Sequence, residues 1–259
     1  MLALTTPASA QTALTAMQTF DDARGWEAVG RLDIAGKGFC TGALIAPGLV
    51  LTAAHCLFDS DTGARIDPAR IEFLAGMRNG RAVAYRNVRR AVTHPEFVML
   101  SSEGTERSRY DLALLELSQP IRPAQITSFA TALPGRAGSD VGVVSYAHDR
   151  AEAPSIEEVC GLMGEAEGLL VMSCDVDFGS SGAPVFRFEN GQAVIVSVIS
   201  AKAQIRGERV ALGATLAGSL EILQADLAAG GGVYQAPAPQ RIGAAANERN
   251  DTGAHFVRP

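Results

Sequence analysis

Short runs of alternating apolar and polar residues fill most of the chain from Ala28 onward. Such alternation, interrupted by Gly, Pro and Asn, is typical of β-strands joined by tight turns. The strands predicted for the first half contain AVGRLDI, FCTGALI, LVLTAA, RIEFLAG, RAVAYRNV and DLALLEL. After the passage SQPIRPAQ the pattern resumes with VGVVSYA, GLLVMSC, PVFRF and AVIVSVIS, and Asn190-Gly191 predicts a two-residue hairpin between the last two. The pattern therefore predicts an all-β protein with two β-rich halves.

Near the end of the second half the apolar period changes from two to about four. Leucines recur at helical spacing, at positions 216, 220, 223 and 227. They predict a terminal amphipathic helix that packs on the second half. We expect four segments: 1–22 outside the fold, 23–124 and 125–230 as the two halves with the helix in the second, and 231–259 as a flexible Gly/Ala/Pro-rich tail. The triplet Ala8-Ser9-Ala10 suggests the remnant of an export signal, and an Ala/Thr-rich disordered terminus is the alternative.

The net charge of −6 argues against nucleic acid or an anionic membrane as a partner, since both select a concentrated basic surface. No apolar run has the length of a transmembrane helix. The four cysteines, Cys40, Cys56, Cys160 and Cys174, form two sequence-local pairs, although spacing alone leaves all three connectivities open. Neither pair is a Cys-x-x-Cys, which argues against a structural zinc site. We expect no metal and no cofactor. If disulfides form, the compartment is oxidising, which favours a secreted or periplasmic protein.

Three polar residues stand out against this apolar background. His55 lies in VLTAAHCLF and is either a catalytic base or a buried core histidine. Asp111 heads the strand DLALLEL, where burial requires a partner such as the Nδ1–H of a histidine. Ser181 lies in DFGSSGAPVF, a loop able to direct backbone N–H groups at one point. Together they have the chemistry of acyl transfer: Ser181 as nucleophile, His55 as base and Asp111 as orienting group, with the N–H groups of Gly179 and Ser181 as the oxyanion hole.

The segments CTGALIAPGLVLTAAHC, HPEF, DLALLEL and GSSGAPV, in the order His, Asp, Ser, resemble the trypsin/chymotrypsin-fold serine proteases. The resemblance covers roughly residues 26–227. It implies two Greek-key antiparallel β-barrels of the chymotrypsin type with a C-terminal helix, His55 and Asp111 in the first barrel and Ser181 in the second. It also implies the bridges Cys40–Cys56 and Cys160–Cys174. The expected function is that of a secreted serine endopeptidase acting on proteins or peptides, with unknown oligomeric state. The alternative is a catalytically idle homologue that binds peptides or partners in the same cleft.

Departures from the family pattern refine this expectation. Vertebrate-type members carry, before the nucleophile, an aspartate that captures a new N-terminal amine, whereas this chain has Ser180. The resemblance is therefore closer to bacterial secreted trypsin-like and glutamyl-endopeptidase-like enzymes, although no histidine occurs in VIVSV, where glutamyl-specific members have one. Asp175, six residues before Ser181, matches the pocket-floor position that attracts Arg or Lys. We expect Val176 and Ser197 beside it; alternatively, Asp175 only braces the loop and the pocket accepts smaller residues.

Overall fold

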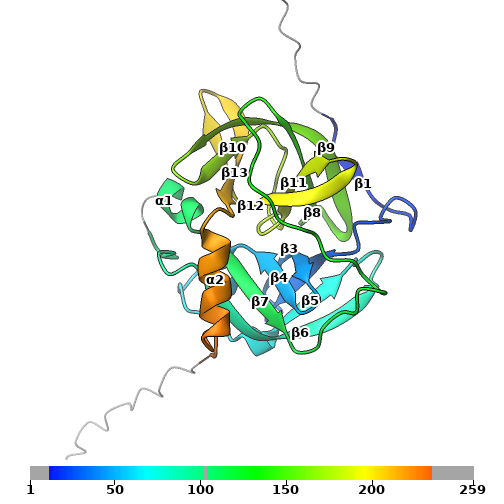
Figure 1. Cartoon of the computed structure of the whole chain (residues 1–259), viewed down its shortest axis with the longest axis vertical. Coiled ribbons are helices and arrows are strands. Elements are labelled where there is room, and N and C mark those ends of the chain that lie inside the picture. The colour runs from blue at the N-terminus through cyan, green and yellow to red at the C-terminus, as the bar shows by residue number, and fades with distance from the viewer. Residues whose placement is uncertain (1–11, 102–103, 235–259) are drawn as a thin grey trace, which may run out of the picture.

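Residues 12–101 and 104–234 are described by the computed structural model, in which two β-barrels lie one above the other (Figure 1). The first is a closed antiparallel barrel with the strand order β2-β3-β4-β7-β6-β5. Its strands are β2 (Val29–Ile34), β3 (Gly38–Ala46), β4 (Leu49–Thr52), β5 (Ile71–Ala75), β6 (Ala84–Thr93) and β7 (Ala113–Leu117). Short helical turns interrupt the connections: η1 (Ala54–Leu57), η2 (Pro68–Arg70) and α1 (Gly104–Arg109).

The second half contains a seven-stranded sheet with the order β1-β9-β10-β13-β12-β11-β8. Its strands are β1 (Thr15–Ala16), β8 (Asp140–Ala147), β9 (Arg150–Ala166), β10 (Leu169–Met172), β11 (Pro184–Glu189), β12 (Gln192–Ile205) and β13 (Glu208–Thr215). Strand β8 also pairs with β9, so the six strands from β8 to β13 form a second ring. The predicted all-β, two-barrel architecture is confirmed.

Local chemistry explains the strands and turns. In the paired strands β4 and β7 of the first barrel, Val50, Leu51, Leu114 and Leu115 are all essentially inaccessible to solvent. Between β11 and β12, Asn190 and Gly191 have φ angles of 50° and 78°, which Asn and Gly adopt more readily than other residues. Glu189 pairs with Gln192 across this turn, so the predicted two-residue hairpin is present.

The N-terminal segment differs from the expectation that residues 1–22 stay outside the fold. Thr15 and Ala16 add a short strand to β9, and the Met17 side chain is only 2% exposed in the core. The free edge of β9 provides backbone partners for this segment, which the weak sequence pattern did not reveal. Residues 1–11, including Ala8-Ser9-Ala10, lie outside the described part of the chain.

The terminal helix α2 (Ser219–Ala228) forms where the leucines predicted it, but it packs on the first barrel rather than the second. Leu220, Leu223 and Leu227 are buried in the same cluster as the first-barrel core, and the helix lies against β6 and β7 (Figure 1). Leucine spacing specifies an apolar helix face but not its partner. After the helix, Ala91 of β6 donates its N–H to Gly232 O at 3.2 Å, so the first residues of the expected tail also contact the first barrel; residues 235–259 lie outside the described part.

Candidate active site

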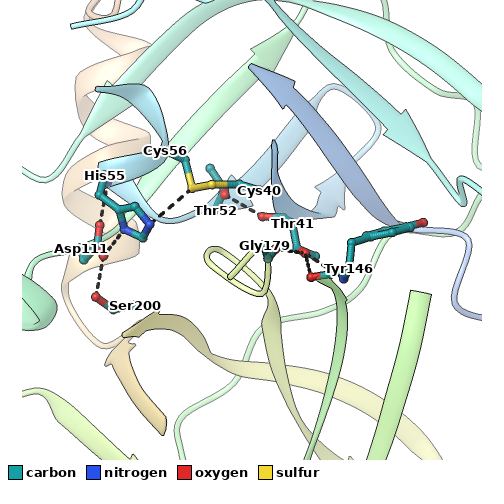
Figure 2. Close-up of a disulfide and its surroundings, with 9 residues drawn as sticks. All are labelled: Cys40, Thr41, Thr52, His55, Cys56, Asp111, Tyr146, Gly179 and Ser200. Atoms are coloured by element: carbon teal, nitrogen blue, oxygen red, sulfur yellow. Dashed lines mark hydrogen bonds and ion pairs between the residues drawn. A yellow bond between two sulfur atoms is a disulfide. The ribbon is translucent and has the colours of Figure 1, made fainter. Parts of the chain in front are cut away.

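His55 lies in the η1 turn directly after β4 and contacts a buried carboxylate at the head of β7. Asp111 is 1% exposed, and its Oδ2 lies 2.6 Å from His55 Nδ1 (Figure 2). The His55 backbone N–H also donates to Asp111 Oδ1 at 2.8 Å. These bonds satisfy a carboxylate that would be costly to bury alone. They also place the Nδ1 proton towards Asp111, which leaves Nε2 as the proton acceptor.

Ser200 supplies a third hydrogen bond to this carboxylate, and the sequence reasoning missed it. Its Oγ donates to Asp111 Oδ2 at 2.5 Å from β12 of the second barrel (Figure 2). In the β12–β13 pairing, Ile199 and Ala201 face Gly213 and Leu212 respectively, so Ser200 occupies a β-bulge. Bulges redirect a side chain relative to the regular alternation. The sequence holds no direct signal for this bulge.

The loop that carries Ser181 leaves two backbone N–H groups without an acceptor. Within residues 177–183, all of them described, the other five N–H groups have acceptors: Asp177 bonds to Ser180 Oγ, Phe178 to Asp177 Oδ1, Ser180 to Asp177 O, Gly182 to Ile199 O and Ala183 to Ser180 O. Only the N–H groups of Gly179 and Ser181 lack one in this loop. Two free donors on either side of one residue have the chemistry of an oxyanion hole.

Ser181 lies in the part of this loop that is docked against the first barrel. Its carbonyl accepts a hydrogen bond from Thr41 N at 2.8 Å, and Thr41 follows Cys40, which is bridged to the neighbour of His55, Cys56. Among the described residues, no hydrogen bond joins Ser181 Oγ to His55, whose Nε2 lies 3.9 Å from Cys56 Sγ. Hydrogen bonds between catalytic side chains are often long without substrate. The structure thus brings His55 and Asp111 into direct contact and docks the Ser181 loop beside their barrel.

A hollow of about 1040 Å³ opens beside this loop. Its lining includes Asp175, Val176 and Asp177 from the segment before Ser181, and Lys202 and Arg209 from β12 and β13; neither His55 nor Ser181 lines it. Ser197 does not reach it either, because this residue is fully buried and donates to Ala214 O at 2.7 Å. Of the three expected pocket residues, the structure places two in the lining.

The charged groups of the hollow are partly paired. Lys202 Nζ lies 2.7 Å from Asp177 Oδ1, and this bond, together with the Phe178 N–H, lowers the pKa of the Asp177 carboxyl. Asp175 donates its backbone N–H to Glu157 Oε2 at 2.7 Å, and Glu157 is fully buried on β9. No hydrogen bond to the exposed Asp175 carboxylate occurs within the described residues. The backbone of Asp175 is therefore anchored, and the exposed residue lines the hollow.

Two disulfides link these parts, with the connectivity that the resemblance implied. Cys40–Cys56 joins β3 to the His55 turn, and Cys160–Cys174 joins β9 to the segment before Asp175. The atoms of Cys40, His55 and Cys56 lie within 4.8 Å of one another, but sulfurs in a disulfide are not thiolate ligands for a metal. The bridges are consistent with an extracellular location. Within the described residues, no helix has the length and apolarity to cross a membrane.

Comparison with known proteins identifies related peptidases. The sequence model of the trypsin-like peptidase domain matches residues 40–195. The chain is 26% identical over 150 residues to a glutamyl endopeptidase of Bacillus licheniformis, covering 58% of this chain and 45% of the relative. It is 29% identical over 189 residues to serine protease 23 of Mus musculus, covering 61% and 49%. The chain thus spans about half the length of the curated relatives it matches.

Solved structures show the same fold. A Glu endopeptidase in complex with MPD superposes with a TM-score of 0.69 at 18% identity, covering 85% of this chain and 99% of that structure. The protease Anisep from Arthrobacter nicotinovorans gives a TM-score of 0.61 at 18% identity, covering 78% and 96%. These likenesses confirm the trypsin/chymotrypsin fold. Since the family model matches more than half of this chain, the chain belongs to the trypsin-like peptidase domain family.

Proposed function

We propose that this chain is a secreted serine endopeptidase that cleaves proteins or peptides through an acyl-enzyme on Ser181. The observation that carries the proposal is the buried Asp111 carboxylate bonded to His55 Nδ1, within a domain of the trypsin-like peptidase family. The two free N–H groups of the Ser181 loop support it.

In the proposed reaction, the same groups act first in forming the acyl-enzyme and again in its hydrolysis. His55 Nε2 accepts the Ser181 Oγ proton as the oxygen attacks the substrate carbonyl carbon, and Asp111 stabilises the imidazolium that forms. The carbonyl oxygen becomes an oxyanion between the N–H groups of Gly179 and Ser181. His55 then gives the proton to the leaving amine, and the C–N bond breaks. Water repeats the sequence on the acyl ester and regenerates the Ser181 hydroxyl.

A catalytically idle homologue that binds peptides in the cleft is the alternative. Such a protein has no use for a fully buried carboxylate, whose desolvation costs free energy that its hydrogen bonds only offset. Here the Asp111 carboxylate accepts three such bonds, two of them from His55. In an enzyme, this carboxylate orients the His55 imidazole and stabilises its protonated form during the reaction, so the arrangement favours the enzyme.

For the substrate side chain that precedes the cleaved bond, we propose a preference for Arg or Lys. Asp175 lines the hollow and its carboxylate has no partner among the described residues, whereas Lys202 is already paired with Asp177. The volume of the hollow accommodates a long side chain, against the alternative of a narrow pocket. A glutamyl preference, which the name of one relative suggests, would require Arg209 or Lys202 to bind a substrate carboxylate instead.

Labelling by a fluorophosphonate probe tests the proposed function. The wild type should be labelled at Ser181 at about pH 8, and Ser181→Ala should lose both labelling and peptide hydrolysis without unfolding, because nucleophile and base act as a unit. Ser60→Ala, which changes an exposed turn serine, is the matched control and should be labelled like the wild type. Folded wild type that is not labelled would contradict the enzyme proposal.

The pocket proposal needs a separate comparison of otherwise identical peptides with Arg, Glu, Ala or Phe before the cleaved bond. Arg should be preferred, and Asp175→Ser should lower kcat/KM for the Arg peptide about 10- to 100-fold, the value of a charge-assisted hydrogen bond. The Ala peptide is the internal control, because its side chain has no charged group that could bind the Asp175 carboxylate. A wild-type preference for Glu, or an unchanged Arg preference in the variant, would refute the role of Asp175.

A further inference from the structure

Thr41, on β3 of the first barrel, contacts the Ser181 loop with both its backbone and its side chain. The residue is fully buried, and its Oγ1 donates to Gly179 O at 2.9 Å (Figure 2). The same Oγ1 accepts the Tyr146 N–H at 3.0 Å, which orients the hydroxyl. Its own N–H donates to Ser181 O at 2.8 Å. One residue of the first barrel thus binds the carbonyls on both sides of Ser180.

Two further carbonyls of the loop are also held, each by a different group. Phe178 O accepts the His148 N–H at 2.7 Å, and Ser180 O accepts the Ala183 N–H at 2.9 Å. In a trans peptide the C=O and the following N–H point in opposite directions. Fixing Phe178 O and Ser180 O therefore turns the N–H groups of Gly179 and Ser181 the other way, where they have no acceptor in the loop.

Gly179 is the point at which this arrangement is weakest. Its φ is +95°, and a Cβ there would lie 2.4 Å from the Phe39 ring, so the position requires glycine. Glycine has the widest range of backbone conformations, and the peptides on its two sides can rotate with little steric resistance. A rotation that turned the Gly179 N–H away would remove one donor of the proposed oxyanion hole.

We propose that Thr41 is a positioning residue: its hydroxyl fixes the peptide that follows Gly179, the His148 N–H fixes the preceding peptide that carries the Gly179 N–H, and the two together keep that N–H directed at the oxyanion. This inference rests on the proposed function. The hydroxyl comes from the first barrel and the loop from the second, so docking of the two barrels completes the oxyanion hole. Ser180, between Gly179 and Ser181, is buried, and its Oγ donates to Ser145 Oγ at 3.2 Å. The described N-terminal segment pairs with β9 through β1, so these backbone bonds are made to β9 and not to the Ser181 loop.

The test compares three variants with the wild type. Thr41→Val removes the hydroxyl and keeps the branched shape, and Thr41→Ser keeps the hydroxyl. Thr12→Val is the matched control, since Thr12 Oγ1 also donates to one backbone carbonyl and accepts one backbone N–H, both of Val159, at the remote edge of β9. Active-site titration gives the concentration of active enzyme for each variant. All assays are run well below the unfolding temperature of each variant.

Thr41→Val should lower kcat about 10- to 100-fold with little change in KM, because a misplaced oxyanion donor weakens transition-state binding but not substrate binding. Affinity for a peptide boronic acid, which forms a tetrahedral adduct, should fall by a similar factor. Thr41→Ser should regain most of the lost kcat, and Thr12→Val should keep it. Hydrogen–deuterium exchange of the 177–183 peptide should become faster in Thr41→Val alone.

An unchanged kcat in Thr41→Val, beside an active wild type, would overturn the inference and leave the proposed function intact. A loss that Thr41→Ser does not rescue, or that Thr12→Val shares, would also overturn it, since general packing would then be the cause. If the wild type neither hydrolyses peptides nor reacts with a fluorophosphonate, the proposed function fails instead. In that case the exchange experiment still decides whether Thr41 holds the loop.

Discussion

Gly182, the residue after the candidate nucleophile, has no room for a side chain. Its φ is +79°, and a Cβ would lie 2.1 Å from Thr52 Oγ1 and 2.3 Å from Thr41 O. The second of these atoms belongs to the backbone of the first barrel and cannot move aside without displacing β3. The glycine therefore sets how closely the Ser181 loop approaches the strand that precedes His55.

We expect Gly182→Ala to destabilise the protein by about 3 kcal/mol or more, from the left-handed backbone and from overpacking together. Gly36→Ala is the matched control, because Gly36 has a φ of +71° but open space around it. It should cost only about 1 kcal/mol, for the backbone alone. Chemical denaturation gives both values, and fluorophosphonate labelling should slow only in Gly182→Ala. Similar losses in the two variants would show that loop docking tolerates the extra carbon.

At the scale of single residues, the contact between Asp111 and His55 could be predicted from the sequence, because it follows from the cost of burying a carboxylate without a partner. An acid heading an apolar strand needs a partner, and Asp111 is bonded to His55. Ser200 and Thr41 escaped because their roles depend on a β-bulge and on barrel docking, which no local pattern reports. Ser197 was assigned to the pocket from its strand alone, yet its side chain is fully buried and bonds to Ala214 O.

Among the elements, the segment before the nucleophile loop is fastened to β9 by several bonds. The bridge Cys160–Cys174 joins the two, and Gly161 and Ser173 exchange two hydrogen bonds, Gly161 N to Ser173 Oγ at 2.8 Å and Ser173 N to Gly161 O at 3.0 Å. The buried Glu157 carboxylate accepts the Asp175 N–H directly beyond them. The floor of the hollow is thus positioned by β9 rather than by the loop itself.

Replacing both cysteines, Cys160→Ala with Cys174→Ala, should lower the free energy of unfolding by about 3 kcal/mol, as expected for a loop of this length. Peptide hydrolysis should fall mainly through KM, since the hollow loosens while His55 and Asp111 keep their contact. The pair Cys40→Ala with Cys56→Ala is the comparison, and it should lower kcat instead because it releases the His55 turn. Identical kinetic effects of the two double variants would argue against separate roles for the bridges.

Elements were predictable in type more than in partner. Alternation and leucine spacing identify strands and the helix α2, because each depends on neighbouring residues only. The surface that α2 covers, and the strand that Thr15 and Ala16 join, depend on which apolar face or edge the rest of the fold leaves open. Those choices arise from long-range packing and could not be derived from local periodicity.

For the molecule as a whole, the candidate site lies at the junction of the two barrels. His55, Asp111 and Thr41 come from the first barrel, and Ser181 and Ser200 from the second. Aromatic rings also hold this junction: Phe186 of β11 lies 5.0 Å from Trp26 and 4.8 Å from Phe129, measured between ring centroids. Loss of barrel docking would therefore separate the proposed nucleophile from its base, so activity and global stability are coupled.

Because of that coupling, a residue such as His94, which affects global stability, also affects activity. The residue is 4% exposed, stacks on the Tyr110 ring at 4.8 Å between centroids, and accepts the Glu96 N–H on Nδ1 at 3.3 Å. Burial lowers the pKa of the His94 imidazole, and the nearby Glu96 carboxylate opposes this only in part. The unfolded chain consequently binds a proton at this residue more readily than the folded protein does.

The sign of the effect follows directly. The stability contributed by neutral His94 is fully present above the ordinary histidine range and is lost as the pH falls from that range towards the lowered folded-state pKa. His94→Asn keeps an acceptor for the Glu96 N–H but does not titrate. It should be less stable than the wild type at about pH 8, where the stack on Tyr110 is lost, and the difference should shrink towards about pH 5. Urea denaturation of both proteins across this interval gives the difference directly, because the two proteins differ at position 94 alone. A difference that stays constant or widens on acidification would mean that His94 does not destabilise the fold by taking up a proton.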